Sequence, residues 1–168
     1  MLITVLNIFE ARDTHKNFDA VVSLVDQKSW VNFSHPHHKV GVFADIEDPR
    51  VSSAPKYDQI AEIMDWAAAL DPKTNLLVHC YAGQCRSTAM AIAIAVLHGA
   101  TPADAYMKLI KIHPDGRLFW PNSLVLRHAE KYLYKHYKNH KGMTEDIQRL
   151  STITGGLKVA LLGMEKEI

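Results

Sequence analysis

The fold is decided by the segment His79-Cys80-Tyr81-Ala82-Gly83-Gln84-Cys85-Arg86-Ser87-Thr88. Before it, Asn75 to Val78 form a short apolar run that follows turn-forming residues and is typical of a buried strand. After it, Ala89 to Leu97 are apolar on every side, as expected of a helix in the centre of a domain. The pattern predicts a strand, a tight loop, and a helix whose N-terminus opens from that loop.

Such a loop is suited to bind a tetrahedral anion. Its backbone N–H groups and the positive end of the helix dipole attract negative charge, and Arg86 can add a planar fork of donors. A cysteine at this position, Cys80, is expected to ionise readily and act as a nucleophile. Gly83 fits where the chain must curl tightly. The segment therefore predicts a nucleophile and an anion cradle in one element.

This arrangement resembles the His-Cys-x5-Arg-Ser/Thr signature of the cysteine-dependent protein tyrosine and dual-specificity phosphatases. A second segment, Arg117 to Asn122, is similar to the R-x-x-x-P-N segment that follows the signature in dual-specificity phosphatases. The similarity covers roughly residues 1–137 and implies a phosphatase domain there. Residues 138–168 are then expected to be a C-terminal helical extension, which packs on the core or on a partner subunit of a homodimer.

The resemblance implies a role for each residue of the signature. Cys80 attacks phosphorus and forms a cysteinyl-phosphate, and Ser87 donates a hydrogen bond to the sulfur and helps it leave. His79 orients the loop. The phosphate oxygens are held by the Arg86 guanidinium and by the main-chain amides of Tyr81, Ala82, Gly83, Gln84, Cys85 and Arg86.

A general acid is also required, and in the family an aspartate on a separate, earlier loop supplies it. Asp45 and Asp48 both match in position. We favour Asp45 because it directly follows a predicted strand, which fixes a side chain better than the middle of a loop does. Asp48, whose spacing matches relatives with a shorter loop, is the alternative, and either residue could instead cap a turn.

The remaining pattern predicts an α/β fold with a mostly parallel central sheet, helices on both faces, and the phosphatase-type loop between a strand and a buried helix. Strands are expected at Leu2 to Val5, Ala20 to Val25 and Lys39 to Phe43, and amphipathic helices at Tyr57 to Leu70, Thr101 to Ile112 and Asn122 to Tyr137. A further helix begins at Thr144, and Gly155-Gly156 is expected to bend or break it.

Composition excludes several classes of function. The net charge of +1 favours neither a nucleic acid nor a membrane surface as the partner. Both cysteines lie in one loop, which argues against a secreted disulfide framework and for a cytoplasmic location. His35, His37 and His38 lack companion ligands for a metal site, and the mechanism needs no cofactor.

The expected substrate is a phosphorylated protein or a small aryl phosphate. Positions 81–85 carry no Lys or Arg, which argues against polyphosphorylated lipids and favours phosphotyrosine. Three alternatives stay open: dual specificity that includes phosphoserine and phosphothreonine, a catalytically impaired phosphate-binding module, and a thiol redox protein that uses Cys80 and Cys85. Cys85 is otherwise a small side chain that supports the loop.

Overall fold

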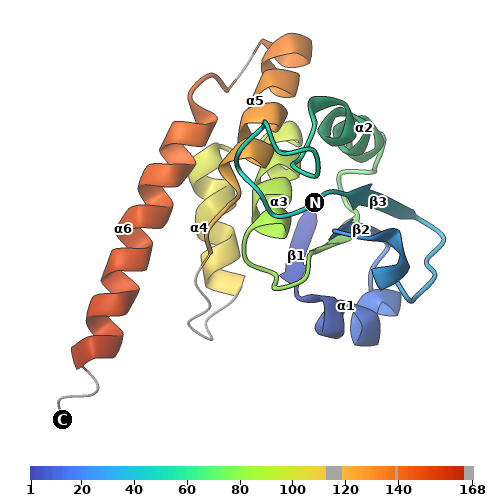
Figure 1. The fold of residues 1–168 in the computed structure, drawn as a ribbon, viewed down its shortest axis with the longest axis horizontal. Coiled ribbons are helices and arrows are strands. Elements are labelled where there is room, and N and C mark those ends of the chain that lie inside the picture. The colour runs from blue at the N-terminus through green and yellow to red at the C-terminus, as the bar shows by residue number, and fades with distance from the viewer. Residues whose placement is uncertain (113–118, 139, 165–168) are drawn as a thin grey trace.

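The computed structural model of the chain describes residues 1–112, 119–138 and 140–164. The residues 113–116, whose Pro and Gly predict a turn, and Arg117 lie outside the described residues. The elements, labelled in Figure 1 apart from β4 and two single 3-10 turns, are β1 (Leu2–Leu6), α1 (Ile8–Thr14), η1 (His15–Asn17), β2 (Ala20–Val25), η2 (Lys28–Trp30), β3 (His38–Val42), α2 (Tyr57–Ala68), β4 (Asn75–His79), α3 (Arg86–Leu97), α4 (Pro102–Ile112), α5 (Ser123–Tyr137) and α6 (Met143–Met164).

The four strands form one sheet in the order β1-β4-β2-β3, and every pair is parallel. In register, Val78 of β4 lies between Val5 of β1 and Val22 of β2. Parallel strands need crossover connections, and here helices supply them. The predicted parallel sheet with helices on both faces is confirmed. Its geometry brings the carboxyl ends of all four strands to one edge.

Alternate residues of the strands enter two separate apolar clusters. Val5, Val22 and Val78 point into the large core beneath α2, α3, α4 and α5. Val21 and Leu77 point to the opposite face and pack on α1. Because both faces are covered, the strands read as continuous hydrophobic runs. Helix α3 crosses the centre of the large core, and this explains why it is apolar on all sides.

The helix boundaries follow local capping. Asn7 accepts hydrogen bonds from the N–H groups of Phe9 and Glu10 at the start of α1. Thr101, where the sequence predicts a helix to begin, accepts from the N–H of Asp104 and caps α4. Helix α3 begins at Arg86, ahead of the apolar run, because the loop itself turns into the helix.

The sequence predicts that Gly155-Gly156 bends or breaks the C-terminal helix. A break is wrong, because α6 runs without interruption from Met143 to Met164. Gly155 serves packing instead. A Cβ at this position would lie 2.9 Å from the Trp120 ring, so only glycine lets the helix approach so closely.

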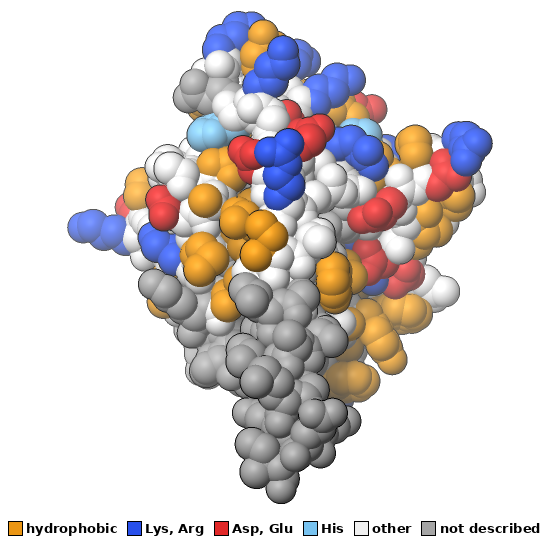
Figure 2. All heavy atoms as spheres, turned by 90° about the vertical axis from the view of Figure 1, so that its left-hand side faces the viewer, with side chains coloured by type: hydrophobic (Ala, Val, Ile, Leu, Met, Phe, Trp, Pro, Cys, Tyr) orange, Lys and Arg blue, Asp and Glu red, His pale blue; other side chains and the backbone are white. Residues whose placement is uncertain are grey.

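Helix α6 packs on α4 and α5 within the chain (Figure 1). Met143 and Ile147 are buried in the large core, and the Tyr106 hydroxyl lies 2.7 Å from that of Thr154. The face shown in Figure 2 carries hydrophobic side chains at its centre and Lys and Arg side chains above them. A homodimer through this helix stays a prediction.

None of the helices in the described part of the chain is both long and apolar enough to cross a membrane.

A buried polar network crosses the sheet near the loop. The Ser23 hydroxyl on β2 lies 2.6 Å from Nε2 of His38 on β3 and 2.6 Å from Nε2 of His79 on β4. Burial lowers the pKa of His79 to about 4, and the neighbouring His38 adds to this shift. Burial likewise lowers the pKa of His38 to about 4, with smaller contributions from His35 and His15. Both rings are therefore neutral at pH 7, and they link three strands.

This network predicts that the protein loses stability in mild acid. The unfolded chain binds a proton at each histidine near pH 6.5, whereas the folded chain resists it until about pH 4. The histidine contribution is therefore complete above pH 6.5 and is lost as the pH falls towards 4. Urea unfolding at several pH values should show a loss of about 3 kcal/mol from His79 over this range.

The slope of the unfolding free energy against pH should be reduced in His79→Gln. It should be kept in His37→Gln, which changes an exposed histidine. Equal slopes in the wild type and in His79→Gln would contradict this account.

Candidate active site

The predicted loop joins β4 to α3 and curves around Cys80. Residues 80–86 of this loop are called the bowl. The Cys80 side chain is 2% exposed. Its sulfur lies 3.1 Å from the Ser87 hydroxyl and accepts a hydrogen bond of 3.3 Å from the N–H of Gly83. The N-terminus of α3, which begins at Arg86, lies next to this sulfur. The loop thus brings Cys80 and Ser87 together as the signature predicts.

Gly83 is required by both conformation and space. Its φ of +70° is in the left-handed region that side chains disfavour. A Cβ on Gly83 would lie 2.8 Å from the carbonyl carbon of Leu6 and 2.9 Å from the nitrogen of Asn7. Because these are backbone atoms, they cannot move aside as a flexible side chain could. The glycine therefore lets the loop pack directly against the end of β1.

Arg86 is held from two neighbouring strand ends. Its Nη1 donates to the carbonyl of Phe43, which follows β3, over 2.7 Å. Its Nη2 donates to the carboxylate of Asp26, which follows β2, over 3.1 Å. The Arg86 side chain is 4% exposed, whereas that of Asp26 is 31% exposed. The third nitrogen, Nε, is buried and has no hydrogen-bond partner among the described residues, so the guanidinium keeps a donor for an anion.

A cavity of about 470 Å³ opens over this bowl. It brings Cys80 and Arg86 together with Asp45, the predicted acid. Its lining residues are Asp26, Trp30, Ala44, Asp45, Ile46, Cys80, Tyr81, Ala82 and Arg86.

The two candidate acids differ in their surroundings. Asp45 accepts a 2.8 Å hydrogen bond from the amide nitrogen of Asn122 and lines the cavity. Asp48 is absent from that lining and forms an ion pair of 2.7 Å with Arg50. Hydrogen bonds from the side chain and backbone of Arg50 lower the pKa of Asp48, which keeps this carboxylate ionised. Asp45 is therefore better placed to deliver a proton.

The segment from Trp120 to Ser123 contacts both the loop that follows Cys80 and the segment that carries Asp45. The N–H groups of Trp120 and Asn122 donate to the carbonyls of Gln84 and Cys85, each over 3.2 Å. Asn122 also caps α5 by accepting from the N–H groups of Leu124 and Val125. The Pro121-Asn122 part of the second predicted segment thus lies against the bowl.

Cys85 lies beside Asp45 and is partly buried. Burial raises the pKa of its thiol to about 12, and the Asp45 carboxylate adds to this shift. The thiol is protonated at neutral pH and is a weak nucleophile, because the thiolate is the reactive form. This setting favours the structural interpretation of Cys85 over the redox interpretation.

The histidine segment 35–38 is used by the fold. His35 lies 3.0 Å from the carbonyl of Phe18, and His38 faces Ser23. Among the described residues, no three His, Cys, Asp or Glu side chains are grouped to hold a metal ion.

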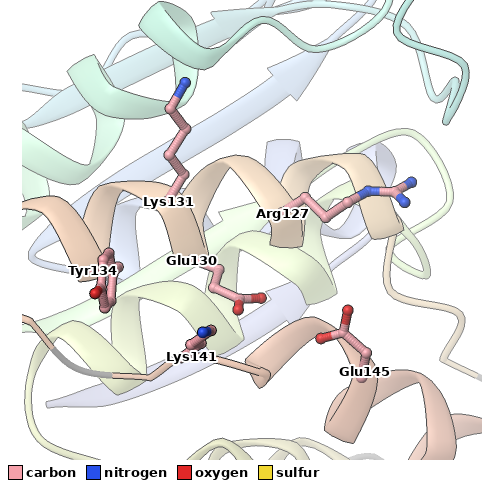
Figure 3. Close-up of a pocket in the computed structure, with 6 residues that line it drawn as sticks. All are labelled: Arg127, Glu130, Lys131, Tyr134, Lys141 and Glu145. Atoms are coloured by element: carbon pink, nitrogen blue, oxygen red, sulfur yellow. The ribbon is translucent and has the colours of Figure 1, made fainter.

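A different cavity, of about 370 Å³, lies between α5 and α6 and contains none of the signature residues (Figure 3). Its central carboxylate, Glu130, accepts hydrogen bonds from the N–H groups of Gly142 and Thr144 and from the Thr144 hydroxyl. Glu130 therefore anchors the start of α6, which gives this cavity a structural explanation.

The sequence missed two contributors to the bowl. Asp26 follows a buried strand that pairs with β4, and this position at the carboxyl end of β2 was the available signal. The contact of Arg86 with the Phe43 carbonyl could not be predicted from the sequence, because every residue has a backbone carbonyl.

No protein-family model matches the chain, and no curated protein sequence matches it. Solved structures do match. Tk-PTP in its active form is 20% identical, with a TM-score of 0.50 over 82% of this chain and 91% of that chain. PTPMT1 in complex with PI(5)P is 13% identical, with a TM-score of 0.51 over 80% of this chain and 88% of that chain.

A leucine rich repeat and phosphatase domain containing protein from Entamoeba histolytica is 18% identical, with a TM-score of 0.52 over 83% of this chain and 91% of that chain. Identities this low speak for the fold and not for the reaction. Together with the parallel sheet and the loop between β4 and α3, they show that the chain has the fold of the protein tyrosine phosphatases.

Proposed function

We propose that the chain is a cysteine-dependent phosphatase that hydrolyses phosphate monoesters through a cysteinyl-phosphate, with phosphotyrosine as the favoured substrate. One observation carries this proposal: three groups line the same cavity. They are a buried sulfur that is hydrogen-bonded to the Gly83 N–H and the Ser87 hydroxyl, the Arg86 guanidinium with one N–H left unpaired among the described residues, and the Asp45 carboxylate. A nucleophile, an oxyanion cradle and a proton donor are the groups that phosphoryl transfer needs.

In the first step the Cys80 thiolate attacks phosphorus, and the bond from phosphorus to the leaving oxygen breaks. The loop amides and Arg86 hold the three equatorial oxygens while charge shifts onto them. Asp45 gives its proton to the leaving oxygen, so the product departs as a neutral alcohol or phenol.

In the second step water attacks the phosphorus of the cysteinyl-phosphate. Asp45, now a carboxylate, takes the proton from that water, and the bond between phosphorus and sulfur breaks. The Ser87 hydroxyl, 3.1 Å from the sulfur, stabilises the departing thiolate. The products are phosphate and the enzyme in its starting state.

An aromatic substrate is supported by the residues at the mouth of the cavity. Tyr81 and Trp30 line it, with ring centroids 5.8 Å apart, and offer flat apolar surfaces to a phenyl ring. Dual specificity and a binding module without turnover remain the alternatives, and the assays below separate them. In this proposal, 1–137 form the phosphatase domain and 138–168 the extension.

The proposal predicts hydrolysis of p-nitrophenyl phosphate. Cys80→Ser should abolish turnover, because a serine hydroxyl is a poor nucleophile without an adjacent base. Arg86→Lys should lower kcat/KM by about 10²- to 10³-fold, as expected for loss of a preorganised donor. Wild-type turnover no greater than that of Cys80→Ser between about pH 5 and 7.5 would favour the binding module. Dithiothreitol-dependent reductase activity would favour the redox protein.

The acid assignment predicts a contrast between two aspartates. Asp45→Asn should lower kcat by about 10²-fold with little change in phosphate inhibition, since it removes a proton donor and keeps the shape. Asp48→Asn, which loses only an exposed ion pair, should change kcat less than twofold. Steady-state kinetics with p-nitrophenyl phosphate measure both. The reverse pattern would make Asp48 the acid.

Asp26 is predicted to act through the position of Arg86. Asp26→Ala leaves one guanidinium nitrogen without its acceptor and should lower kcat/KM by about 10- to 100-fold and weaken inhibition by phosphate. Asp26→Asn keeps an oxygen acceptor and should recover part of the loss. Glu62→Ala, which breaks an exposed pair with Lys39, is the matched control and should change kcat/KM less than twofold. Equal losses in all three variants would contradict the role of Asp26.

A further inference from the structure

Three exposed aromatic side chains gather beside the catalytic cavity. Phe9 on α1 is 58% exposed, Trp30 on η2 is 39% exposed, and Tyr81 in the loop is 53% exposed. The ring centroid of Tyr81 lies 6.3 Å from that of Phe9 and 5.8 Å from that of Trp30. Large apolar side chains that cluster on a surface mark a binding site more often than isolated ones do. The proposed function uses Trp30 and Tyr81, which also line the catalytic cavity, and gives no role to Phe9.

A second cavity, of about 300 Å³, lies among these rings. Trp30 and Tyr81 line both this cavity and the catalytic one, so the two are neighbours that share a wall. The residues that line the second cavity are Ile8, Phe9, Arg12, Ser29, Trp30, Asn32 and Tyr81.

The second cavity is held in place by the loop itself. The N–H of Ile8 donates to the carbonyl of Tyr81 over 3.2 Å, which ties the start of α1 to the residue after the nucleophile. The Asn7 cap then fixes the first turn of α1, which carries Phe9. A rigid apolar site at a fixed distance from the phosphate bowl can select a substrate by what flanks its phosphate.

We propose that this second cavity, the Phe9–Trp30–Tyr81 pocket, binds an apolar side chain one or two residues away from the phosphorylated residue of a protein substrate. The proposal rests on the proposed phosphatase function and names its substrate class. Trp30 and Tyr81 line both cavities, so a side chain one or two residues from the phosphorylated one, at about 3.3–3.6 Å per residue of extended chain, is within reach of the neighbouring cavity. Burial of the apolar side chain against these rings would then add to binding.

The charges around the two cavities favour a peptide over an anionic membrane. Of the described residues that line either cavity, only Arg12 and Arg86 are cationic. Arg86 is buried in the bowl, and Arg12 is paired with Asp13 over 2.8 Å. Asp26 and Asp45 also line the catalytic cavity, so the described residues of neither lining offer a cluster of unpaired Lys or Arg side chains that would attract anionic lipid. A partner that offers apolar side chains and one phosphate fits this surface better.

The test compares phosphotyrosyl peptides flanked only by alanine with peptides that carry Leu or Phe one or two positions to either side. The rate with p-nitrophenyl phosphate, which fills the bowl alone, is the reference. In the wild type, the best apolar peptide should exceed the alanine peptide in kcat/KM by about tenfold. Phe9→Ala should remove most of this advantage. Tyr134→Ala changes an aromatic residue of similar exposure on α5 and should leave the advantage unchanged.

Binding of the same peptides to Cys80→Ser, followed by fluorescence anisotropy, separates this proposal from the proposed function. A preference for the apolar peptide that disappears with Phe9→Ala supports the pocket, even if the wild type hydrolyses nothing. If the wild type hydrolyses p-nitrophenyl phosphate but shows no preference for the apolar peptides, the pocket proposal is overturned and the proposed phosphatase function is kept. A preference that survives Phe9→Ala also overturns it.

The last experiment measures hydrolysis of phosphatidylinositol monophosphate in phosphatidylcholine vesicles by the wild type and by Phe9→Ala. One outcome is that Phe9→Ala lowers hydrolysis of the lipid while the peptides show no apolar preference. The pocket then binds lipid, and the peptide proposal is overturned. If the apolar preference among peptides is present and the lipid rates of wild type and Phe9→Ala agree, the peptide proposal is supported.

Discussion

The geometry of the site depends on the two hydrogen bonds that hold the Arg86 guanidinium. One goes to the Phe43 carbonyl after β3 and the other to Asp26 after β2, while Arg86 itself begins the helix that follows β4. Three strand ends therefore meet at one side chain. This is possible only because the strands are parallel and end at the same edge of the sheet. A buried guanidinium without these acceptors would be costly, so the site and the sheet stabilise each other.

The second support of the bowl comes from sequence far from the loop. Backbone N–H groups of Trp120 and Asn122 hold the carbonyls of Gln84 and Cys85, and the Asn122 side chain reaches Asp45. The segment that carries the candidate acid and the loop that carries the nucleophile are thus attached to the same turn before α5. Their separation is set by this turn together with two direct contacts, that of Arg86 with the Phe43 carbonyl and that of Cys85 with Asp45. In the proposed mechanism, this fixes the proton donor relative to the sulfur.

Much of this arrangement could be predicted from the residues. The Cys80 to Ser87 spacing, the buried strand before it and the apolar helix after it specify the loop, because few other structures need glycine and arginine at those positions. The contacts that could not be predicted from the sequence mostly involve backbone atoms or pairs of residues that are distant in the chain. The Phe43 carbonyl, the contact of Asp26 with Arg86 and that of Asn122 with Asp45 are of this kind. The break predicted at Gly155-Gly156 failed for a related reason, since packing on Trp120 outweighs the weak helix preference of glycine.

Asn122 has one further chemical consequence. Its side-chain oxygen accepts from two N–H groups at the start of α5, which leaves its nitrogen to face Asp45. The two ends of this amide are therefore not interchangeable. Deamidation of Asn122 would put an oxygen where the nitrogen stands, and two carboxylates would then oppose each other across a single hydrogen-bond length. One hydrolysed amide, with no other change in the chain, would remove the N–H donor that ties Asp45 to the segment before α5.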